Sequence, residues 1–173
     1  HKTIFSIVRY GNVLGSRGSI IPLFLSMKNA KEIPITDKRM TRFVITLDKA
    51  VNLVWHAFKD MRGGEVYVKK IPSIKIIELA KAIAPKKKFR MIGIQPGEKL
   101  HEQMIGMDDS YSTYEYRDYY KILPQIYNWH KDSKRIKNGQ KVSENFSYSS
   151  NNNTEWITKL ELKEWINFNK KLF

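Results

Sequence analysis

The chain has 173 residues, 42% of them hydrophobic, and a formal net charge of +14. A chain of this size builds one domain or a large part of one around its own core. It contains no cysteine, which excludes disulfides, thiolate zinc sites and cysteine nucleophiles, and fits a reducing compartment such as the cytoplasm. No apolar run approaches the ~20 residues that a membrane-spanning helix needs.

The first predicted strand covers residues 4–8, whose apolar side chains are typical of a buried strand in a parallel sheet. A turn with three glycines follows at residues 11–18, and the apolar run at residues 19–25 predicts a helix. Open α/β sheets bind ligands beyond the carboxyl ends of their strands. This turn is therefore a candidate ligand site, with an ordinary strand-to-helix turn as the alternative.

Two short strands are predicted over residues 32–37 and 39–45. A helix then begins at Leu47, after Thr46 as N-cap, and ends before Gly63. We expect one face of this helix to be buried, because apolar residues recur on it at helical spacing. These residues are Leu47, Val51, Val54 and Phe58, with Ala50 and Ala57 beside them.

Strands and helices continue to alternate along the chain. Residues 65–68 predict a strand, and a helix follows between Pro72 and Pro85. Residues 89–94 predict a further strand, and residues 98–105 a short helix. This alternation is typical of the α/β class.

The composition changes beyond Met107. Residues 121–124 predict an edge strand closed by proline, and residues 155–172 predict one amphipathic helix. We therefore divide the chain into residues 1–107, which hold the alternating strands and helices and the candidate ligand site, and residues 108–173, a C-terminal extension that ends in the amphipathic helix.

The positive charge requires an anionic partner: nucleic acid, a membrane surface or a phosphate ligand. Much of the excess lies at residues 86–90, 131–141 and 170–171. These runs lack the interleaved aromatic residues of single-strand binders and the periodicity of a basic helix. A solvated lysine-rich surface is the preferred interpretation, and nucleic-acid binding the less favoured one.

Most catalytic signatures are missing from the sequence. There is no Gly-x-Gly-x-x-Gly loop, Walker loop, zinc-ligand spacing or Gly-x-Ser-x-Gly elbow. Tyr127 and Lys131 match the Tyr-x-x-x-Lys of short-chain dehydrogenases, but no cofactor loop precedes them, so we assign no catalytic residue. The four histidines show no ligand pairing; His56 is expected at the surface, and His101 near Glu98 is a candidate for site contact.

Several polar residues lie at loop ends that follow predicted strands. Arginines from separate loops can hold a diphosphate, and a glutamate can accept hydrogen bonds from sugar hydroxyls. The set is Asn12, Arg17, Thr36, Arg42, Gln95 and Glu98.

Six motifs occur in one order: residues 8–13 together with 15–19, then 35–37, 40–43, 70–73, 96–102 and 148–153. Together they closely resemble the inverting UDP-N-acetylglucosamine 4,6-dehydratases, extended short-chain dehydrogenases that open the pseudaminic acid pathway. The resemblance covers nearly the whole chain. It implies the C-terminal half of an enzyme whose NADP loop and catalytic Asp, Lys and Tyr-x-x-x-Lys lie before residue 1, and we expect such an N-terminal part to be missing here.

The resemblance implies an α/β fold, the C-terminal part of an NADP-binding Rossmann-like domain with a smaller substrate-binding region. In the family, NADP takes a hydride from C4 of the sugar, water is eliminated across C5–C6, and the hydride returns to C6 with inversion at C5. The product is UDP-2-acetamido-2,6-dideoxy-L-arabino-hexos-4-ulose. Because the catalytic half is missing, we expect this chain to be inactive by itself.

The resemblance also implies residue roles. Val13 is expected to contact the nicotinamide of NADP. The residues expected to contact the sugar nucleotide are Asn12, Arg17, Gly18, Ser19, Ile20, Ile21, Thr36, Arg42, Gln95 and Glu98. Gln95 stands where the family usually has arginine, so a charge-assisted contact is lost and substrate binding is expected to weaken about ten- to hundred-fold.

Two further functions stay open from the sequence. The chain could be a module that binds sugar nucleotides or an assembly partner without chemistry, or a nucleic-acid binder driven by charge. For the enzyme we expect a homo-oligomer without membrane contact, and we expect the isolated half to be poorly soluble because its sheet edge is exposed.

Overall fold

The computed structural model describes residues 3–169 and divides into two compact units. Unit 1 consists of His1–Tyr10, Leu47–Ile71 and Gln103–Ser149. Unit 2 consists of Gly11–Thr46, Pro72–Glu102 and Ser150–Phe173. Each unit is therefore built from three separate segments of the chain. The division predicted at residue 107 concerns function and stays a prediction.

Unit 1 contains a five-stranded sheet. β1 pairs in parallel with β5, and β5, β10, β9 and β11 follow one another in antiparallel pairs. The strands in spatial order are β1 (Ile7–Arg9), β5 (Val66–Lys69), β10 (Tyr119–Ile122), β9 (Thr113–Glu115) and β11 (Gln140–Lys141). The prediction of an edge strand at residues 121–124 is wrong, because β10 lies between two partners and Pro124 falls after its last hydrogen-bonded pair.

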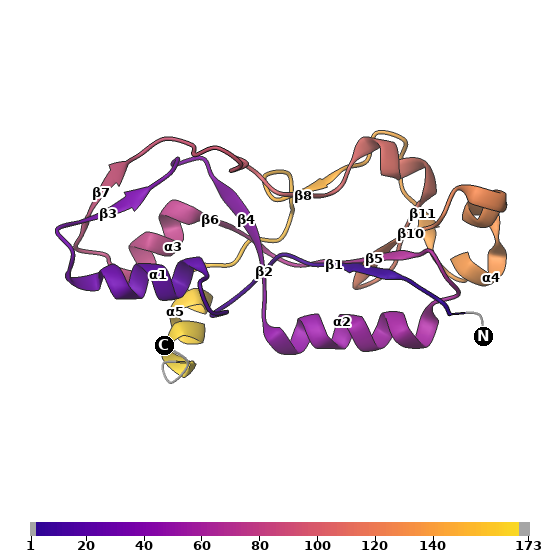
Figure 1. The fold of residues 1–173 in the computed structure, drawn as a ribbon, viewed down its shortest axis with the longest axis horizontal. Helices are drawn as coiled ribbons and strands as arrows, with labels where there is room; N and C mark the ends of the chain where they lie inside the picture. The colour runs from indigo at the N-terminus through magenta and orange to yellow at the C-terminus, as the bar shows by residue number, and fades with distance from the viewer. Residues whose placement is uncertain (1–2, 170–173) are drawn as a thin grey trace. The chain divides into compact units, whose positions relative to one another are not determined.

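Helix α2 (Leu47–Asp60) lies alongside β1 and β5 (Figure 1). Its position is as predicted, but its buried face is not. The four residues predicted to be buried are between 43% and 65% exposed, and the residues facing the core are Ala50, Leu53 and Ala57. Leu53 and Ala57 pack against the buried ring of Tyr67. The small side chains of Ala50 and Ala57 let the helix approach the strands closely. The four larger residues predicted to be buried lie on the solvent-exposed side of the helix.

The first strand is also less buried than its sequence predicts. Ile4, Phe5 and Ile7 are all more than half exposed, although β1 has the predicted parallel pairing. With the outer face of α2, this leaves a group of exposed apolar side chains in unit 1. Its members are Ile4, Phe5, Ile7, Leu47, Val51, Val54, Trp55 and Phe58.

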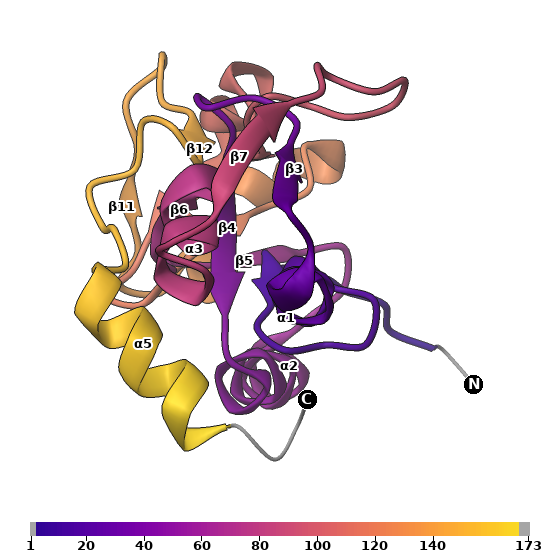
Figure 2. The ribbon, with the colours of Figure 1, turned by 90° about the vertical axis from the view of Figure 1, so that its left-hand side faces the viewer.

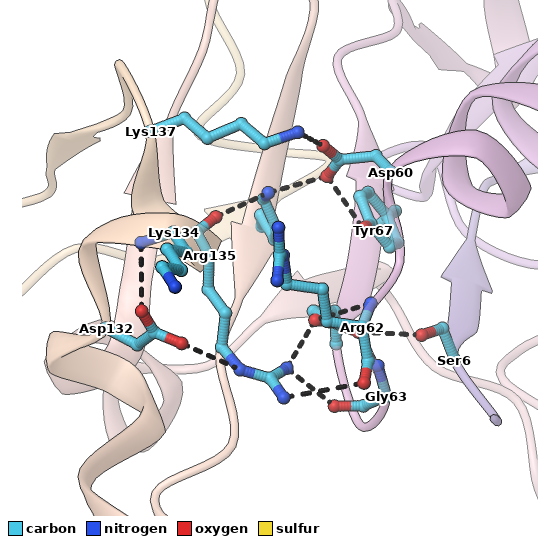
Figure 3. Close-up of polar contacts among 11 residues, drawn as sticks. Ser6, Asp60, Arg62, Gly63, Tyr67, Asp132, Lys134, Arg135 and Lys137 are labelled. Atoms are coloured by element: carbon cyan, nitrogen blue, oxygen red, sulfur yellow. Dashed lines mark hydrogen bonds and ion pairs between the residues drawn. The ribbon is translucent and has the colours of Figure 1, made fainter. Parts of the chain in front are cut away.

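A buried ion pair links two distant segments of unit 1 (Figure 3). Arg135, in the short helix α4 (Ser133–Ile136), donates to Oε1 of Glu65 at 2.5 Å and to the carbonyl of Gly63 at 2.8 Å. The Glu65 carboxylate also accepts hydrogen bonds from Ser6 and from the backbone N–H of Arg62. The side chains of Arg135 and Glu65 are 7% and 1% exposed, and the Nε of Arg135 also lies 3.5 Å from the more exposed Asp132 carboxylate.

A second buried cluster lies around Asp60, at the end of α2. Lys121 donates to Oδ2 of Asp60 at 2.7 Å, and the Tyr67 hydroxyl donates to the same oxygen at 2.8 Å. Lys137 forms a further ion pair with this carboxylate. Burial would raise the pKa of Asp60, but the hydrogen bonds from the two lysines and Tyr67 outweigh it and lower the pKa.

The remaining elements of unit 1 are short. They are the antiparallel pair β8 (Gln103–Ile105) and β12 (Tyr148–Ser149), and the 3₁₀ helices η2 (Met107–Ser112) and η3 (Ile126–Lys131). His56, expected at the surface, is instead half-buried with its ring centroid 4.4 Å from that of Tyr119, and burial lowers its pKa.

Unit 2 combines two small sheets with three α-helices (Figure 2). The first sheet has the order β2 (Asn12–Val13), β4 (Thr41–Ile45) and β6 (Ser73–Lys75), with β2 parallel and β6 antiparallel to β4. The second is the parallel pair β3 (Glu32–Ile35) and β7 (Lys88–Met91). The helices are α1 (Ile20–Ser26), η1 (Met27–Asn29), α3 (Ile76–Ile83) and α5 (Lys159–Phe168).

Two helix predictions in unit 2 need correction. The helix expected after Pro72 begins only at Ile76, because residues 73–75 pair with β4 as β6. The helix expected at residues 98–105 does not form: a turn with Gly97 at φ +85° is followed by extended chain, and Gln103–Ile105 is strand β8. Apolar residues at helical spacing are too few in this segment to outweigh tertiary pairing.

The predicted amphipathic helix is shorter than residues 155–172. The helix begins at Lys159, after Thr158 as N-cap. The Thr158 hydroxyl accepts a hydrogen bond from the N–H of Glu161, and the Glu161 carboxylate accepts one from the N–H of Thr158, which together form a capping box. Leu162 is buried against the core of unit 2, and α5 packs on α3. The predicted helix end and the basic residues 170–171 lie outside the described residues.

The core of unit 2 is formed by aliphatic and aromatic side chains from helices α1 and α3 and strands β3 and β4. Leu79 of α3, Ile33 and Ile35 of β3 and Phe24 of α1 are almost fully buried in it. Over the described range, 3–169, the structure has no helix that is long and apolar enough to cross a bilayer.

The observed face of α2 predicts a contrast between two neighbouring residues. Leu53→Ala removes a buried side chain and is expected to lower the free energy of unfolding by about 2–4 kcal/mol. Val54→Ala, on the exposed face, is expected to cost less than about 1 kcal/mol. Urea unfolding of both variants measures this, and equal losses would contradict the assigned face.

The buried ion pair predicts a large cost for removing one charge. Glu65→Gln leaves the buried Arg135 with only the partly exposed Asp132 carboxylate, 3.5 Å from its Nε, and is expected to lower the free energy of unfolding by about 3 kcal/mol. Glu115→Gln breaks the more exposed pair with Lys70 and is expected to cost less than about 1 kcal/mol. A loss below about 1 kcal/mol for the Glu65 variant, measured by the same urea unfolding, would show that the pair is dispensable.

Candidate functional site

Unit 2 contains a cavity of about 330 Å³ with a mostly apolar wall. Its apolar lining comes from α1, β3, β4 and α3, and includes Phe24, Ile35, Val44 and Leu79. A few polar residues interrupt this wall. Cavities that bind small molecules are commonly of this kind, and 330 Å³ is at the small end of their range. The cavity therefore suits one part of a nucleotide-sized ligand better than the whole of it.

The glycine-rich turn forms one side of the cavity. Asn12 pairs in parallel with Val44, and the N–H of Leu14 donates to the carbonyl of Ile45 at 2.8 Å. A Cβ on Gly11 would lie 2.4 Å from the Cβ of Phe43, so only glycine lets the two backbones approach this closely. The turn then reverses through Gly18, at φ +75°, into helix α1.

Ser19 stands at the junction between this turn and α1, as its N-cap residue. Its hydroxyl oxygen is buried and has no hydrogen-bond partner among the described residues. Ser19 also lines the cavity, so this hydroxyl is a buried polar group next to the cavity wall.

Most of the residues predicted from the sequence gather around this one cavity. Those that line it are Asn12, Val13, Ser19, Ile20, Ile21, Thr36, Arg42 and Glu98. Arg17, Gly18 and Gln95 are not part of the lining. Gln95 instead donates from its backbone N–H to the Glu98 carboxylate at 2.9 Å. The binding roles of all these residues stay predictions.

Arg42 of β4 lines the cavity, and its guanidinium contacts two backbone carbonyls and one carboxylate. Its Nη1 donates to the carbonyls of Thr41 at 2.7 Å and Leu100 at 3.3 Å, and its Nε lies 3.6 Å from Oε1 of Glu102. The side chain is 17% exposed. An arginine held in this way presents a positive charge at a defined position.

Glu102 also contacts the glycine-rich turn. With its amide nitrogen facing Glu102, Asn12 donates to Oε1 at 2.8 Å and to Oε2 at 3.3 Å. In the reverse orientation the amide oxygen of Asn12 would face the carboxylate oxygens of Glu102, and no hydrogen bond could form. Hydrogen bonding therefore assigns the amide nitrogen of Asn12 to the side that faces Glu102. Oε2 accepts as well from the backbone N–H of Phe43 at 2.9 Å. Burial raises the pKa of Glu102, although the Phe43 hydrogen bond and the charge of Arg42 oppose it.

A buried hydroxyl pair holds the backbone next to Glu102. Ser150 Oγ accepts from the N–H of Glu102 at 2.9 Å and lies 2.7 Å from Oγ1 of Thr41. Thr41 in turn lies 2.8 Å from Nδ1 of His101. Burial and the nearby charges of Arg39 and Arg42 lower the pKa of His101, so its neutral ring can accept the Thr41 hydrogen.

The sequence singled out Asn12, Arg42 and Glu98 but assigned no role to Glu102, Thr41 or Ser150. The signal was present, because Glu102 ends the motif at residues 96–102 and Ser150 lies in the motif at residues 148–153. A helix predicted over residues 98–105 obscured it. In the described part of the chain, no group of three or more acidic or histidine side chains could hold a metal ion.

Residues 1–124 match the model of the polysaccharide biosynthesis protein family. The chain is 51% identical over 173 aligned residues to the inverting UDP-N-acetylglucosamine 4,6-dehydratase of Campylobacter jejuni, covering 96% of this chain and 52% of that protein. It is 42% identical to a UDP-glucose 4-epimerase of Rickettsia canadensis, over 70% of this chain and 37% of that protein. The chain thus spans about half the length of the Campylobacter relative, and the resemblance to the dehydratases is confirmed.

A solved structure has the same fold. The X-ray structure of Pen from Bacillus thuringiensis matches with a TM-score of 0.81 at 33% identity, covering 98% of this chain and 51% of that one. The predicted α/β class, of the extended short-chain dehydrogenase type, is confirmed by this likeness and by the parallel strand pairs.

The close backbone approach at the turn predicts different costs for two glycines. Gly11→Ala places a Cβ against the backbone of Phe43 and is expected to lower the free energy of unfolding by about 3 kcal/mol. Gly18→Ala meets no atom within 4 Å, and only its positive φ is unfavourable, at about 1 kcal/mol. Denaturant unfolding compares them, and a greater loss for the Gly18 variant would contradict the packing at Gly11.

Proposed function

The chain belongs to the polysaccharide biosynthesis protein family, and from that premise we propose that it is the substrate-binding half of an inverting UDP-N-acetylglucosamine 4,6-dehydratase. One observation carries the proposal. Segments far apart in the sequence, at residues 12–13, 19–21, 36, 42 and 98, line a single cavity with few polar groups. Those polar groups include the ones that a sugar nucleotide needs: a fixed arginine, an amide, hydroxyls and a carboxylate.

In this proposal Arg42 binds the diphosphate. The carbonyls of Thr41 and Leu100 occupy Nη1, and the donors of Nη2 stay available for phosphate oxygens. Thr36 and Glu98 contact the uridine and the diphosphate region, and Asn12 contacts the sugar. The Ser19 hydroxyl adds a further polar contact in the wall. The predicted residues outside the lining would contact the parts of the ligand that the cavity does not enclose; they are Arg17, Gly18 and Gln95.

NADP, when bound, would supply the hydride acceptor for the reaction at C4. From this chain only Val13 is assigned to it. Val13 is half-buried in the cavity lining, and its apolar side chain fits against the flat face of a ring. The residues of unit 2 accordingly bind and orient the sugar nucleotide, and proton transfer belongs to a complementary half with the catalytic Asp, Lys and Tyr.

The exposed apolar side chains of unit 1 support a complementary half. Leu47, Val51, Val54 and Phe58 repeat along one face of α2, as residues do on a helix that packs against a partner. Further apolar side chains are exposed on and before β1, at residues 4, 5 and 7. The Campylobacter relative is about twice as long as this chain, so a polypeptide matching its remaining half would cover these side chains. By itself the chain is proposed to be inactive.

The dehydration product would serve the synthesis of pseudaminic acid or a related surface glycan. The absence of cysteine fits the reducing cytoplasm, where we place this activity, and we propose a homo-oligomeric assembly. A module that binds the sugar nucleotide without chemistry is the second candidate, favoured by Gln95 in place of arginine. Nucleic-acid binding rests on the net charge alone.

Isothermal calorimetry tests the proposed ligand. We expect the chain to bind UDP-N-acetylglucosamine, and Arg42→Gln to weaken binding about ten- to hundred-fold because a charge-assisted contact is lost. Glu78→Gln, which changes only an exposed pair with Lys81, is the control and should bind normally. A random oligonucleotide should bind weakly and lose its affinity in high salt. Tight oligonucleotide binding without UDP-sugar binding would reject the proposal.

A chimera separates the enzyme from the module without chemistry. This chain replaces the matching 52% of the Campylobacter jejuni dehydratase, so that the relative supplies the rest. Turnover of UDP-N-acetylglucosamine to the 4-keto product supports the enzyme half. Binding without turnover, while the parent dehydratase is active in the same assay, supports the second candidate.

A further inference from the structure

We propose that Glu102 is a positioning residue: its carboxylate holds the Asn12 amide so that the amide oxygen is offered to the ligand, and it holds the Arg42 guanidinium in place. The proposal rests on the proposed function, because it assumes that the cavity binds a sugar nucleotide. Glu102 does not line the cavity itself, and it acts through two residues that do.

The geometry around Glu102 carries this inference. One carboxylate joins three groups from two strands: the Asn12 amide of β2, and the Arg42 side chain and Phe43 N–H of β4. Each of them is a donor, and an ionised carboxylate accepts hydrogen bonds with both oxygens. Glu102 therefore matches all three, and no neutral side chain of the same length can do so.

The carboxylate is held in place from its backbone. Ser150 accepts from the Glu102 N–H, and Glu102 in turn accepts from the N–H of Ser150 with its carbonyl at 2.7 Å. Thr41 and Ser150 are both buried, so these hydrogen bonds are shielded from water. The late motif at residues 148–153 therefore contributes to the site indirectly, by fixing the residue that orients Asn12 and Arg42.

The orientation of Asn12 has a consequence for the ligand. Because its nitrogen faces Glu102, its oxygen is the atom left to accept a hydrogen bond. The ligand must then bring a donor, such as a sugar hydroxyl or an amide N–H. A pyrimidine nucleotide sugar with an acetamido group has donors of both kinds. The polarity of this contact is set by Glu102 and not by Asn12, since an amide can turn either way.

The substitution Glu102→Gln would reverse this polarity. The oxygen of the new amide keeps the hydrogen bond from Phe43, so its NH₂ group turns to Asn12. Asn12 must then turn its own oxygen inward and offer NH₂ to the ligand. Adding Asn12→Asp restores the outward acceptor, because the introduced carboxylate can accept from that NH₂ group with one oxygen and keep the other for the ligand. Asn12→Asp alone sets two carboxylates against each other.

The experiment measures affinity for UDP-N-acetylglucosamine by calorimetry on the full chain. We expect Glu102→Gln and Asn12→Asp each to weaken binding about tenfold. The double variant restores the outward acceptor but not the ion pair with Arg42, so we expect it to bind about as well as Glu102→Gln or better, and not about a hundredfold more weakly than the parent. Glu78→Gln serves as the control. A merely structural role for Glu102 predicts additive losses in the double variant, and that result would overturn the proposal.

A ligand-free readout separates this proposal from the proposed function. The side-chain NH₂ resonance of Asn12, identified by its loss in Asn12→Asp, is followed by NMR between about pH 7 and pH 4, the range in which a carboxyl with a raised pKa titrates. Glu102→Gln is expected to shift this resonance and to abolish its titration. Any step that comes from His101 occurs in both proteins. An Asn12 resonance that neither shifts in Glu102→Gln nor loses its titration there would overturn the positioning role.

If the parent chain does not bind UDP-N-acetylglucosamine but Asn12 still titrates with Glu102, the positioning role stands and the proposed function fails. If the parent binds UDP-N-acetylglucosamine but the Asn12 resonance does not respond to Glu102, the proposed function stands and the positioning role fails. The two hypotheses are thus separated by independent measurements.

Discussion

Parallel pairing of β2 with β4 is the constraint on which the candidate site depends. It requires a glycine at position 11, since any side chain there would collide with Phe43. The pairing places Asn12 beside the strand that carries Arg42, and the Glu102 carboxylate then contacts both residues. A two-residue strand thus brings two of the polar residues in the cavity wall, Asn12 and Arg42, to one carboxylate.

The charges of this basic chain divide into two kinds. Most lysines and arginines are solvated and contribute little to stability. In unit 1, however, Glu65 and Asp60 are paired with Arg135 and Lys121 away from water. Buried pairs of this kind are weak evidence for net stabilisation, but the loss of one partner is costly. The two pairs therefore fix how the segment at residues 60–65 packs against the segment at residues 121–137 within unit 1.

The structure shows where sequence patterns are reliable and where they are not. The helix at residues 47–60 was found, but its apolar residues occupy two faces, and only packing against β1 and β5 decided that Leu53 faces inward. The helix expected at residues 98–105 failed because local spacing competes with pairing to a distant strand, β12. The edge strand predicted at residues 121–124 failed because one of its two partners, β5, lies far away in the sequence.

The sequence predicted several residues of the candidate site but missed the role of Glu102. Motifs pointed to Asn12, Thr36, Arg42 and Glu98, and the structure brings these together around one cavity. Glu102 was present in a motif but had no assigned role, because its hydrogen bond with Phe43 spans 59 positions and cannot be read from spacing.

The sequence by itself determined the α/β class, the family resemblance and the glycine-rich turn at residues 11–18 as a candidate ligand site. These depend on local composition and on ordered motifs, which the chain carries wherever it folds. Only the tertiary structure decided which face of α2 is buried, that Lys121 is paired inside the protein, and that Glu102 joins Asn12 to Arg42. The reason is physical: burial and hydrogen bonding are relations between distant segments, and local propensities do not specify them.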